Sequence, residues 1–520
     1  MTSTAGIYEY NLGIRFERVV EERAENTAIW FKDSDAISYG ALNARANRIA
    51  RFFLAKRISQ NDVVCLCGEK SLGIFAAMLA CLKIGAVYCI LDPETPLERL
   101  RKILRTCTPK LLLGESTFLD RTKAVAAEFD LVVLAKDELE AETYDDSNLG
   151  ETGHVTGSNS CYIMFTSGST GFPKGAVMTH ANVLNLIEWS RETYSIEHDD
   201  VLTNVNPLYF DNSVFDFYAA LFNGARLVPF CKAEVSDPKA LVDKIDAAAC
   251  TLWFSVPSLL IFLQTMRATD GKNLRSVRRF IFGGEGYPKA KLKQLYDAYS
   301  DSSQFFNVYG PTECTCICSS YEVTKDDFEV LRGLPPLGYI AKNFSWLILA
   351  DDDRAVPSGE IGELCLSGPN VGKGYFNDPE RSAASFVQNP LNKMFSEIIY
   401  RTGDLVRFDP QDGKLYIEGR QDNQIKHMGY RIELEEIEAA LNCLDYVSEA
   451  TALHSSANGL SRIVAVVAST EPIDDQRMRR DLGQIIPSYM IPSVFHHEPV
   501  LPKNANGKID RLRLRAHYSR

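Results

Sequence analysis

An alternation of helices with short apolar strands is the feature that most restricts how this chain can fold. Residues 82–100 (LKIGAVYCILDPETPLERL) read as the end of a helix, a strand, a turn and the start of another helix. The prolines of that turn end the strand, since proline cannot donate to a sheet ladder. The same order precedes it, with a helix over 39–53, a strand over 62–67 and a buried helix over 73–84. This pattern predicts a layered α/β architecture with largely parallel sheets.

The chain is 520 residues long, which exceeds what one compact core usually holds. Its composition changes near Gly419, after which come a charged turn, an amphipathic helix over 433–444 and an apolar strand over 463–467. We therefore expect a large multi-layer N-terminal domain with mixed and parallel sheets over 1–419. A small α+β domain over 420–520 is expected to follow, joined to the first by a hinge.

Charge and cysteine content narrow the functional classes. A net charge of −12 does not suggest a basic groove for nucleic acid, and we expect no nucleic-acid partner. The 13 cysteines without a signal peptide predict reduced thiols in the cytoplasm, and no apolar run is long enough for a membrane span. Cys314, Cys316 and Cys318 alternate as on one face of a strand, but no second cluster accompanies them. We interpret them as small buried apolar residues and predict no metal site there.

A loop rich in hydroxyl groups follows the apolar strand of YIMFTSGSTGFPKG (162–175). Its hydroxyls, backbone N–H groups and one ammonium suit a polyphosphate, and its glycines allow the N–H groups to turn inward. The spacing is not that of a Walker A loop. A flexible surface loop is the alternative. The residues concerned are Thr166, Ser167, Gly168, Ser169, Thr170, Gly171 and Lys174.

Further motifs recur in a fixed order along the chain: LKIGAVYCILDP (82–93), NVYGPTE (307–313), GELCLSGPNVGKGY (362–375), YRTGDL (400–405), GRQDNQIKHMGYRIELEEIE (419–438), SYMIP (488–492) and NGKIDR (506–511). Together with the hydroxyl-rich loop, this set resembles the adenylate-forming superfamily from about residue 35 to the end. Within it, the chain resembles the amino-acid adenylation domains of nonribosomal peptide synthetases. Through the last three motifs, it closely resembles the stand-alone D-alanine–carrier-protein ligases.

The resemblance implies ATP as a cofactor, with Mg²⁺. The ring of Tyr309 can stack on adenine, and Asn307 can reach its polar edge. Thr312 offers a hydroxyl to phosphate, and Glu313 is a hard oxygen ligand for Mg²⁺. Asp404 can accept both ribose hydroxyls or, alternatively, cap a helix. By resemblance, Val308, Arg420 and Lys426 also contact the nucleotide, and Asp422 occupies the hinge.

Lys508 is the predicted catalytic lysine, acting with Thr312 and Glu313. A carboxylate that attacks the α-phosphorus is repelled by the phosphate charge, and an ammonium between the two oxyanions offsets this repulsion. The resemblance implies that the C-terminal domain rotates about Asp422. The segment around Gly429 then replaces Lys508 at the site.

The segment PLYFDNSVFDF (207–217) is expected to hold the substrate. Asp211 should pair with a substrate ammonium, because a buried cation needs a buried partner; capping the following helix is its alternative role. The resemblance implies a pocket without charged side chains apart from Asp211 and Lys508. Its members are Asp211, Asn212, Phe215, Phe254, Ile281, Gly283, Val308, Cys316, Ile317 and Lys508.

A small neutral amino acid fits that pocket, with proline or a small aliphatic or hydroxylated side chain preferred. D-alanine ligases carry cysteine at the position of Gly283, so the glycine is expected to leave more room. Asn212 is the polar group able to read a hydroxyl. We therefore expect formation of an aminoacyl-AMP, followed by transfer to the phosphopantetheine thiol of a peptidyl carrier protein. The chain ends about twelve residues after Lys508, which predicts a carrier acting in trans. An acyl- or aryl-CoA ligase on the same scaffold is the alternative.

Overall fold

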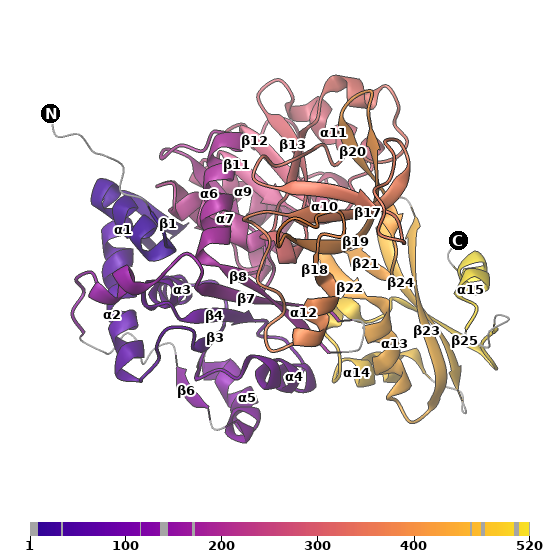
Figure 1. The fold of residues 1–520 in the computed structure, drawn as a ribbon, viewed down its shortest axis with the longest axis horizontal. Helices are drawn as coiled ribbons and strands as arrows, with labels where there is room; N and C mark the ends of the chain where they lie inside the picture. Colours follow the sequence, from indigo (N-terminus) through magenta and orange to yellow (C-terminus); the bar gives the residue numbers. More distant parts are fainter. Residues whose placement is uncertain are drawn as a thin grey trace.

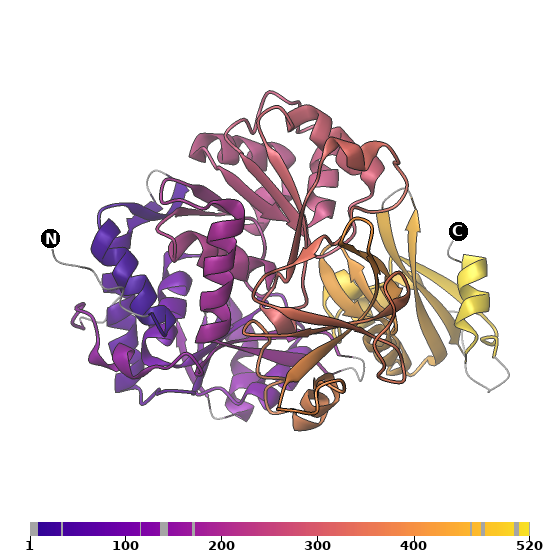
Figure 2. The same cartoon turned by 45° about the horizontal axis from the view of Figure 1, so that its top comes forward.

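The computed structural model describes residues 9–32, 35–114, 116–129, 131–135, 144–168, 172–457, 460–469, 474–503 and 509–518. The elements before residue 420 form the bulk of the molecule, and the later ones gather at the end opposite α1 and α2 in both views (Figure 1, Figure 2). The fold class expected from the sequence, a large α/β part followed by a smaller α+β part, is confirmed.

Two large sheets form the α/β part. The first has the order β6 (Val132–Ala135), β5 (Leu111–Gly114), β3 (Val63–Cys67), β4 (Val87–Leu91), β7 (Ser160–Thr166), β8 (Lys174–Thr179). It is parallel up to β7, and β8 is antiparallel to β7. The second has the order β15 (Tyr339–Ile340), β14 (Ser319–Glu322), β13 (Gln304–Tyr309), β12 (Arg279–Gly283), β11 (Leu252–Ser255), β9 (Val201–Asn204), β10 (Arg226–Pro229), β1 (Thr27–Lys32), β2 (Asp35–Ser38). Its central strands are parallel, as the helix–strand alternation predicts.

Helices pack around these sheets and between them (Figure 1). They are α1 (Leu12–Arg23), α2 (Tyr39–Ala55), α3 (Leu72–Ile84), α4 (Leu97–Cys107), α5 (Ser116–Glu128), α6 (His180–Tyr194), α7 (Asn212–Leu221), α8 (Lys232–Ser236), α9 (Pro238–Ala248), α10 (Pro257–Thr265), α11 (Lys289–Tyr299) and α12 (Pro379–Ser385). The helix α3 is apolar on nearly every side and correspondingly buried throughout. Ser71 caps its first turn, and Gly85 ends it at φ 70°.

A third, antiparallel sheet leads to the C-terminal part. Its order is β16 (Ser345–Leu349), β17 (Ile361–Ser367), β19 (Ile398–Asp409), β18 (Phe386–Gln388), with β20 (Lys414–Arg420) also paired to β19. The C-terminal elements are β21 (Gln424–His427), β22 (Tyr430–Glu433), α13 (Leu434–Asn442), β23 (Val447–Ala457), β24 (Leu460–Ser469), α14 (Asp475–Leu482), β25 (Val494–Glu498) and α15 (Arg511–Tyr518). A separate cluster of buried side chains, including Ile437 and Val467, forms the core of this part.

The described helices include none that is both long and apolar enough to cross a bilayer. The alternating cysteines do not form a strand: Cys314 lies in a 3₁₀ turn, and Thr315 and Cys316 have φ of 59° and 72°. Cys314, Cys316 and Cys318 are all buried, which agrees with their interpretation as apolar residues.

Candidate active site

The candidate site lies where the parallel strands β11, β12 and β13 end. Phe254, Ile281 and Phe306 are paired across these strands, and Gly283 is paired with Val308. Ligands commonly bind outside the carboxyl ends of parallel strands, because loops and helix starts converge there. The segments that begin α7 and follow β13 meet at this edge and provide the polar side chains.

Asp211 lies just before α7 but does not cap it, since its side chain accepts no hydrogen bond from the helix backbone. Its carboxylate instead accepts a hydrogen bond of 2.5 Å from the hydroxyl of Thr312. Burial raises the pKa of Asp211, while Thr312 and the charges of Arg431 and Lys426 partly oppose the rise. Asp211 is thus a half-buried acid with no ion-pair partner among the described residues, so its charged form can take up a ligand cation.

Most of the predicted substrate residues line one cavity beside Asp211. Asn212, Phe254, Val308, Cys316 and Ile317 contribute to its wall. Phe215 packs against Phe254 with ring centroids 5.0 Å apart, and Ile281 is fully buried. The same cavity is also lined by charged side chains from the nucleotide side and the C-terminal part, namely Asp404, Arg420, Lys426 and Arg431.

The expectation that Gly283 leaves more room is wrong. A Cβ atom at this glycine would lie 2.4 Å from the carbonyl oxygen of Val308 and 2.6 Å from its Cγ2. The neighbouring strand therefore fills the space of the absent side chain. By contrast, Nδ2 of Asn212 is buried and has no hydrogen-bond partner among the described residues. A donor of this kind is costly unless a ligand satisfies it.

The predicted nucleotide residues form a connected group on the other side of the cavity. The Tyr309 hydroxyl donates to Asp404 at 2.5 Å, and Arg420 pairs with the other oxygen of Asp404 at 2.6 Å. The ammonium of Lys426 lies 5.2 Å from the centre of the Tyr309 ring. Asn307 donates to the carbonyl of Pro336. Asp404 therefore forms an ion pair and accepts from a tyrosine in this arrangement, and it does not cap a helix.

The hydroxyl-rich loop closes the β7–β8 hairpin, so it leads into a strand and not into the helix that follows a Walker A loop. Ser169, Thr170 and Gly171 lie outside the described residues. Ser167 donates to the carbonyl of Arg431 and accepts from the N–H of Glu433, and the N–H of Gly168 donates to Glu436. The hydroxyl of Thr166 is buried without a partner among the described residues. Part of the loop is thus in contact with the C-terminal part of the chain.

Glu313 lies at the centre of a cluster of cations and is fully buried. Arg431 lies 2.6 Å from its Oε2, while Lys174 and the Tyr375 hydroxyl lie 3.5 and 2.8 Å from its Oε1. Burial works against ionisation, but Arg431 and Lys174 outweigh it and hold the pKa of Glu313 well below its usual range. A charged carboxylate oxygen suits Mg²⁺, but in this arrangement the Arg431 guanidinium occupies the position beside Oε2 that a metal ion would take.

The β21–β22 hairpin reaches into the site, as the resemblance implies for the segment around Gly429. Gly429 lines the cavity beside Asp211, and a Cβ atom there would lie 2.5 Å from Val256. Asp422 precedes the hairpin, and Arg420 holds its carboxylate through two hydrogen bonds of 2.7 and 2.8 Å. Lys508 lies outside the described residues.

Sequence reasoning did not single out several residues that the structure brings to the site. Arg431 and Tyr375 contact Glu313, and Arg99 of α4 forms a buried ion pair with Glu436 of α13. Arg431 could have been identified from the sequence. It pairs with Lys426 across the hairpin, so a turn recognised at Met428-Gly429 puts both side chains on one face. The other two contacts join residues far apart in the chain, and no local pattern marks them.

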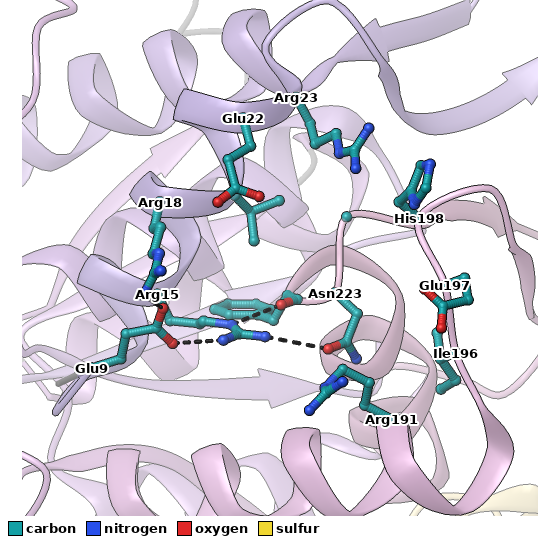
Figure 3. A pocket seen from close by; sticks show the side chains of 13 residues that line it. Glu9, Arg15, Arg18, Glu22, Arg23, Arg191, Ile196, Glu197, His198 and Asn223 are labelled. Carbon is teal, nitrogen blue, oxygen red and sulfur yellow. Dashed lines mark hydrogen bonds and ion pairs between the residues drawn. The ribbon is translucent and has the colours of Figure 1, made fainter. Parts of the chain in front are cut away.

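A second hollow lies far from these motifs, between α1, α6 and the turn after α7 (Figure 3). It is lined by arginines, but Arg15 is held by Glu9 at 2.7 Å and by the carbonyl of Phe222, and Arg18 also pairs with Glu9. None of the residues predicted for catalysis lies there. We therefore place the candidate active site at the ends of β11–β13.

Comparison with known proteins shows the family to which the chain belongs. The family model described as AMP-binding enzyme matches residues 16–376 of the chain. The chain is 34% identical over 508 residues to the dimodular nonribosomal peptide synthase of Bacillus subtilis (strain 168), covering 96% of this chain and 20% of that protein. The chain thus spans about a fifth of that relative's length.

Two solved structures share the fold. An artificially fused adenylation–PCP di-domain, NpsA-ThdA from Klebsiella oxytoca, has a TM-score of 0.81 at 21% identity, over 94% of both chains. The o-succinylbenzoate CoA synthetase of Bacillus subtilis has a TM-score of 0.85 at 22% identity, over 98% of both chains. The family match covers most of the chain, and the chain belongs to the AMP-binding enzymes of the adenylate-forming superfamily.

Proposed function

We propose that this protein activates a small neutral amino acid with Mg²⁺-ATP as an aminoacyl adenylate and then transfers it to a thiol. The substrate carboxylate attacks the α-phosphorus, and pyrophosphate leaves. The thiol of a phosphopantetheine group on a separate peptidyl carrier protein then attacks the aminoacyl carbonyl, and AMP leaves. Proline or a small aliphatic or hydroxylated amino acid is the preferred substrate.

The observation that carries this proposal is Asp211. It is a half-buried carboxylate with a raised pKa, it caps no helix, and Phe254, Val308 and Ile317 form the apolar part of the wall of its cavity. A substrate ammonium would supply the counterion that this group lacks. A fatty or aryl acid would bring no charge to meet it. The buried Nδ2 of Asn212 favours a substrate oxygen near the same wall.

The second half of the reaction is supported by a cavity of about 500 Å³ on the far side of the β21–β22 turn. Met428 and Tyr430 line this cavity, while Gly429 between them lines the cavity beside Asp211. Val256, Leu259 and Phe262 give the larger cavity an apolar wall. We propose that a slender, flexible thiol chain approaches the aminoacyl group from this cavity.

In this proposal, the residues predicted from the sequence keep their roles. Tyr309, Asp404 and Arg420 bind adenosine, and the hydroxyl-rich loop with Lys174 binds phosphate. Glu313 takes the metal ion, which would offset the phosphate charge. Lys508 stabilises the adenylation transition state. Rotation about Asp422, at the boundary between residues 1–419 and 420–520, exchanges Lys508 for the β21–β22 hairpin.

Pyrophosphate exchange with a panel of acids tests the proposal. Proline, glycine, alanine, serine and threonine in both enantiomeric forms where they exist are compared with their desamino analogues, fatty acids and benzoic acids. We expect exchange with a small neutral amino acid and none with its desamino analogue. Equal exchange with the analogue would remove the role of Asp211 and favour an acyl- or aryl-CoA ligase. If the enzyme formed a thioester with coenzyme A and not with a holo-carrier protein, the result would also favour an acyl- or aryl-CoA ligase.

A further inference from the structure

Glu285 joins the β21–β22 turn to the N-terminus of α10. Its Oε2 accepts a hydrogen bond of 3.0 Å from the N–H of Gly429, and its Oε1 accepts one of 2.7 Å from the N–H of Ser258. Glu285 follows β12 in the large α/β part, whereas Gly429 belongs to the hairpin that the proposed rotation moves. One carboxylate thus connects a fixed helix with a moving turn.

The contact with α10 orients this carboxylate before the turn arrives. Helix α10 begins at Pro257, and its N-cap residue, Val256, has no side chain that can accept a hydrogen bond. Ser258 N–H is one of the unpaired donors at that helix end, and Oε1 of Glu285 satisfies it. The partial positive charge of the helix N-terminus also favours a carboxylate there. Oε2 is therefore held in place to receive a second donor.

The backbone conformation of the turn directs its N–H toward Glu285. Met428 and Gly429 have φ of 51° and 82°, the left-handed pair typical of a tight two-residue hairpin turn. Val256 packs directly against Gly429, so the turn approaches closely enough for the hydrogen bond. The N–H of Gly429 then points at Glu285 and not into the strand ladder, where β21 and β22 pair from His427 and Tyr430 onward.

We propose that Glu285 is a positioning residue for thioester formation, which docks the Gly429 turn without contacting substrate or nucleotide. The inference rests on the proposed function, because it assigns the docked turn to the second half-reaction. Loss of the contact should weaken docking and slow transfer. It should leave adenylation unchanged, because that step uses the other rotational state.

Glu285→Gln is the informative variant. Glutamine has nearly the shape of glutamate but only one acceptor oxygen, so one of the two backbone N–H groups loses its partner. Asp237→Asn is the matched control. Asp237 caps α9 through two backbone N–H groups and lies in an exposed position, so it makes the same kind of contact away from the hairpin.

The experiment has three readouts on the full chain: amide hydrogen exchange of residues 424–433, pyrophosphate exchange with the preferred amino acid of the panel above, and aminoacyl transfer to free D-pantetheine. In Glu285→Gln we expect faster hydrogen exchange in the hairpin and transfer slower by about tenfold, the effect of one charge-assisted hydrogen bond. Pyrophosphate exchange should be unchanged. Asp237→Asn should match the wild type in all three readouts.

Two results would overturn the inference: unchanged hydrogen exchange in the hairpin, or equal losses in both half-reactions, which would mean that Glu285 serves only to cap α10. Faster exchange in the α10 peptide without a change in the hairpin would lead to the same conclusion. If the wild type exchanged pyrophosphate with none of the acids tested, the proposed function would fail, and the hydrogen-exchange comparison would still decide whether Glu285 docks the turn.

Discussion

Arg431 and Glu313 form an ion pair of 2.6 Å that ties the β21–β22 hairpin to the segment after β13. The carboxylate is fully buried, and the guanidinium side chain is 15% exposed. If Glu313 holds Mg²⁺, as the sequence predicts, a metal ion at its Oε2 would compete with Arg431 for that oxygen. We therefore propose that the docked hairpin and the metal-bound nucleotide belong to different states of the site.

Replacing Arg431 with alanine should weaken the docked state of the hairpin and so affect the two half-reactions differently. The substitution leaves Glu313 buried without its main counterion when the hairpin is docked, a loss that typically costs ~3–5 kcal/mol. We expect aminoacyl transfer to fall by at least about tenfold, with a much smaller effect on pyrophosphate exchange. Single-turnover assays of the two half-reactions measure this difference. Arg431→Lys retains the charge and should show a smaller loss; if both half-reactions fell together in Arg431→Ala, the assignment to one state would be wrong.

Restricting the hinge should give a similar separation by another route. Asp422→Pro fixes one backbone dihedral between β20 and β21, so rotation is hindered while either domain stays folded. Adenylation should survive and thioester transfer should fall. Asp422→Asn is the control, since it removes the ion pair with Arg420 but leaves the backbone free. If Asp422→Asn lost as much transfer activity as Asp422→Pro, the effect would be due to the lost ion pair and not to hindered rotation.

Lys508→Ala should abolish adenylation while ATP binding and folding stay close to those of the wild type. The prediction rests on the segment NANGKIDR and on the need for a cation between substrate carboxylate and α-phosphate. Pyrophosphate exchange measures adenylation, and protection of the thermal transition by ATP measures binding. Near-normal exchange in this variant would refute the catalytic role.

The alternation of helices and strands predicted the layered α/β fold, because periodicity reports which faces are buried. The segments over 73–84 and 62–67 appear as α3 and β3 nearly at the predicted bounds. Local patterns say less about pairs of distant residues. The ion pair of Arg99 with Glu436 and the contact of Glu285 with Gly429 depend on how the C-terminal part docks, which no window of sequence contains.

The substrate pocket shows the same limit. Asp211 and Phe254 could be singled out because the family resemblance implies their positions in the pocket, and for Asp211 also because a substrate ammonium needs a buried partner. The effect of Gly283 could not be predicted, since it depends on the neighbouring strand. Val308 approaches Gly283 closely enough to fill the space that a missing side chain suggests.

Phe254→Ala should relax the size limit of the pocket. Phe254 lines the cavity and packs against Phe215, so its removal opens space beside Asp211. We expect kcat/KM to shift toward bulkier neutral amino acids, each methylene group being worth roughly 1–3 kcal/mol. Phe282→Ala is the matched control, because Phe282 is also buried but packs against Tyr287 in a different cluster of buried side chains. Both variants should lose stability; a shift in selectivity that also appeared in Phe282→Ala would argue against a specific role for Phe254.

The pH dependence of amino-acid activation should report the charge of Asp211. Burial raises the pKa of this carboxyl above its ordinary value of about 3.9, so it becomes protonated at a pH where an exposed aspartate is still charged. The protonated form cannot pair with an ammonium, so kcat/KM for the amino acid should fall as the pH is lowered through the raised pKa. Binding of the ammonium favours the charged form, so amino-acid binding in this range should release a proton.

Asp211→Asn removes the titrating group, and it should lower kcat/KM by at least about tenfold at neutral pH and abolish this acid limb. Because Asp211 contacts the amino-acid side of the cavity, the KM for ATP should barely change. Profiles of pyrophosphate exchange at saturating ATP measure all three effects, and an acid limb that persisted unchanged in Asp211→Asn would assign the titration to another group and remove the ammonium anchor.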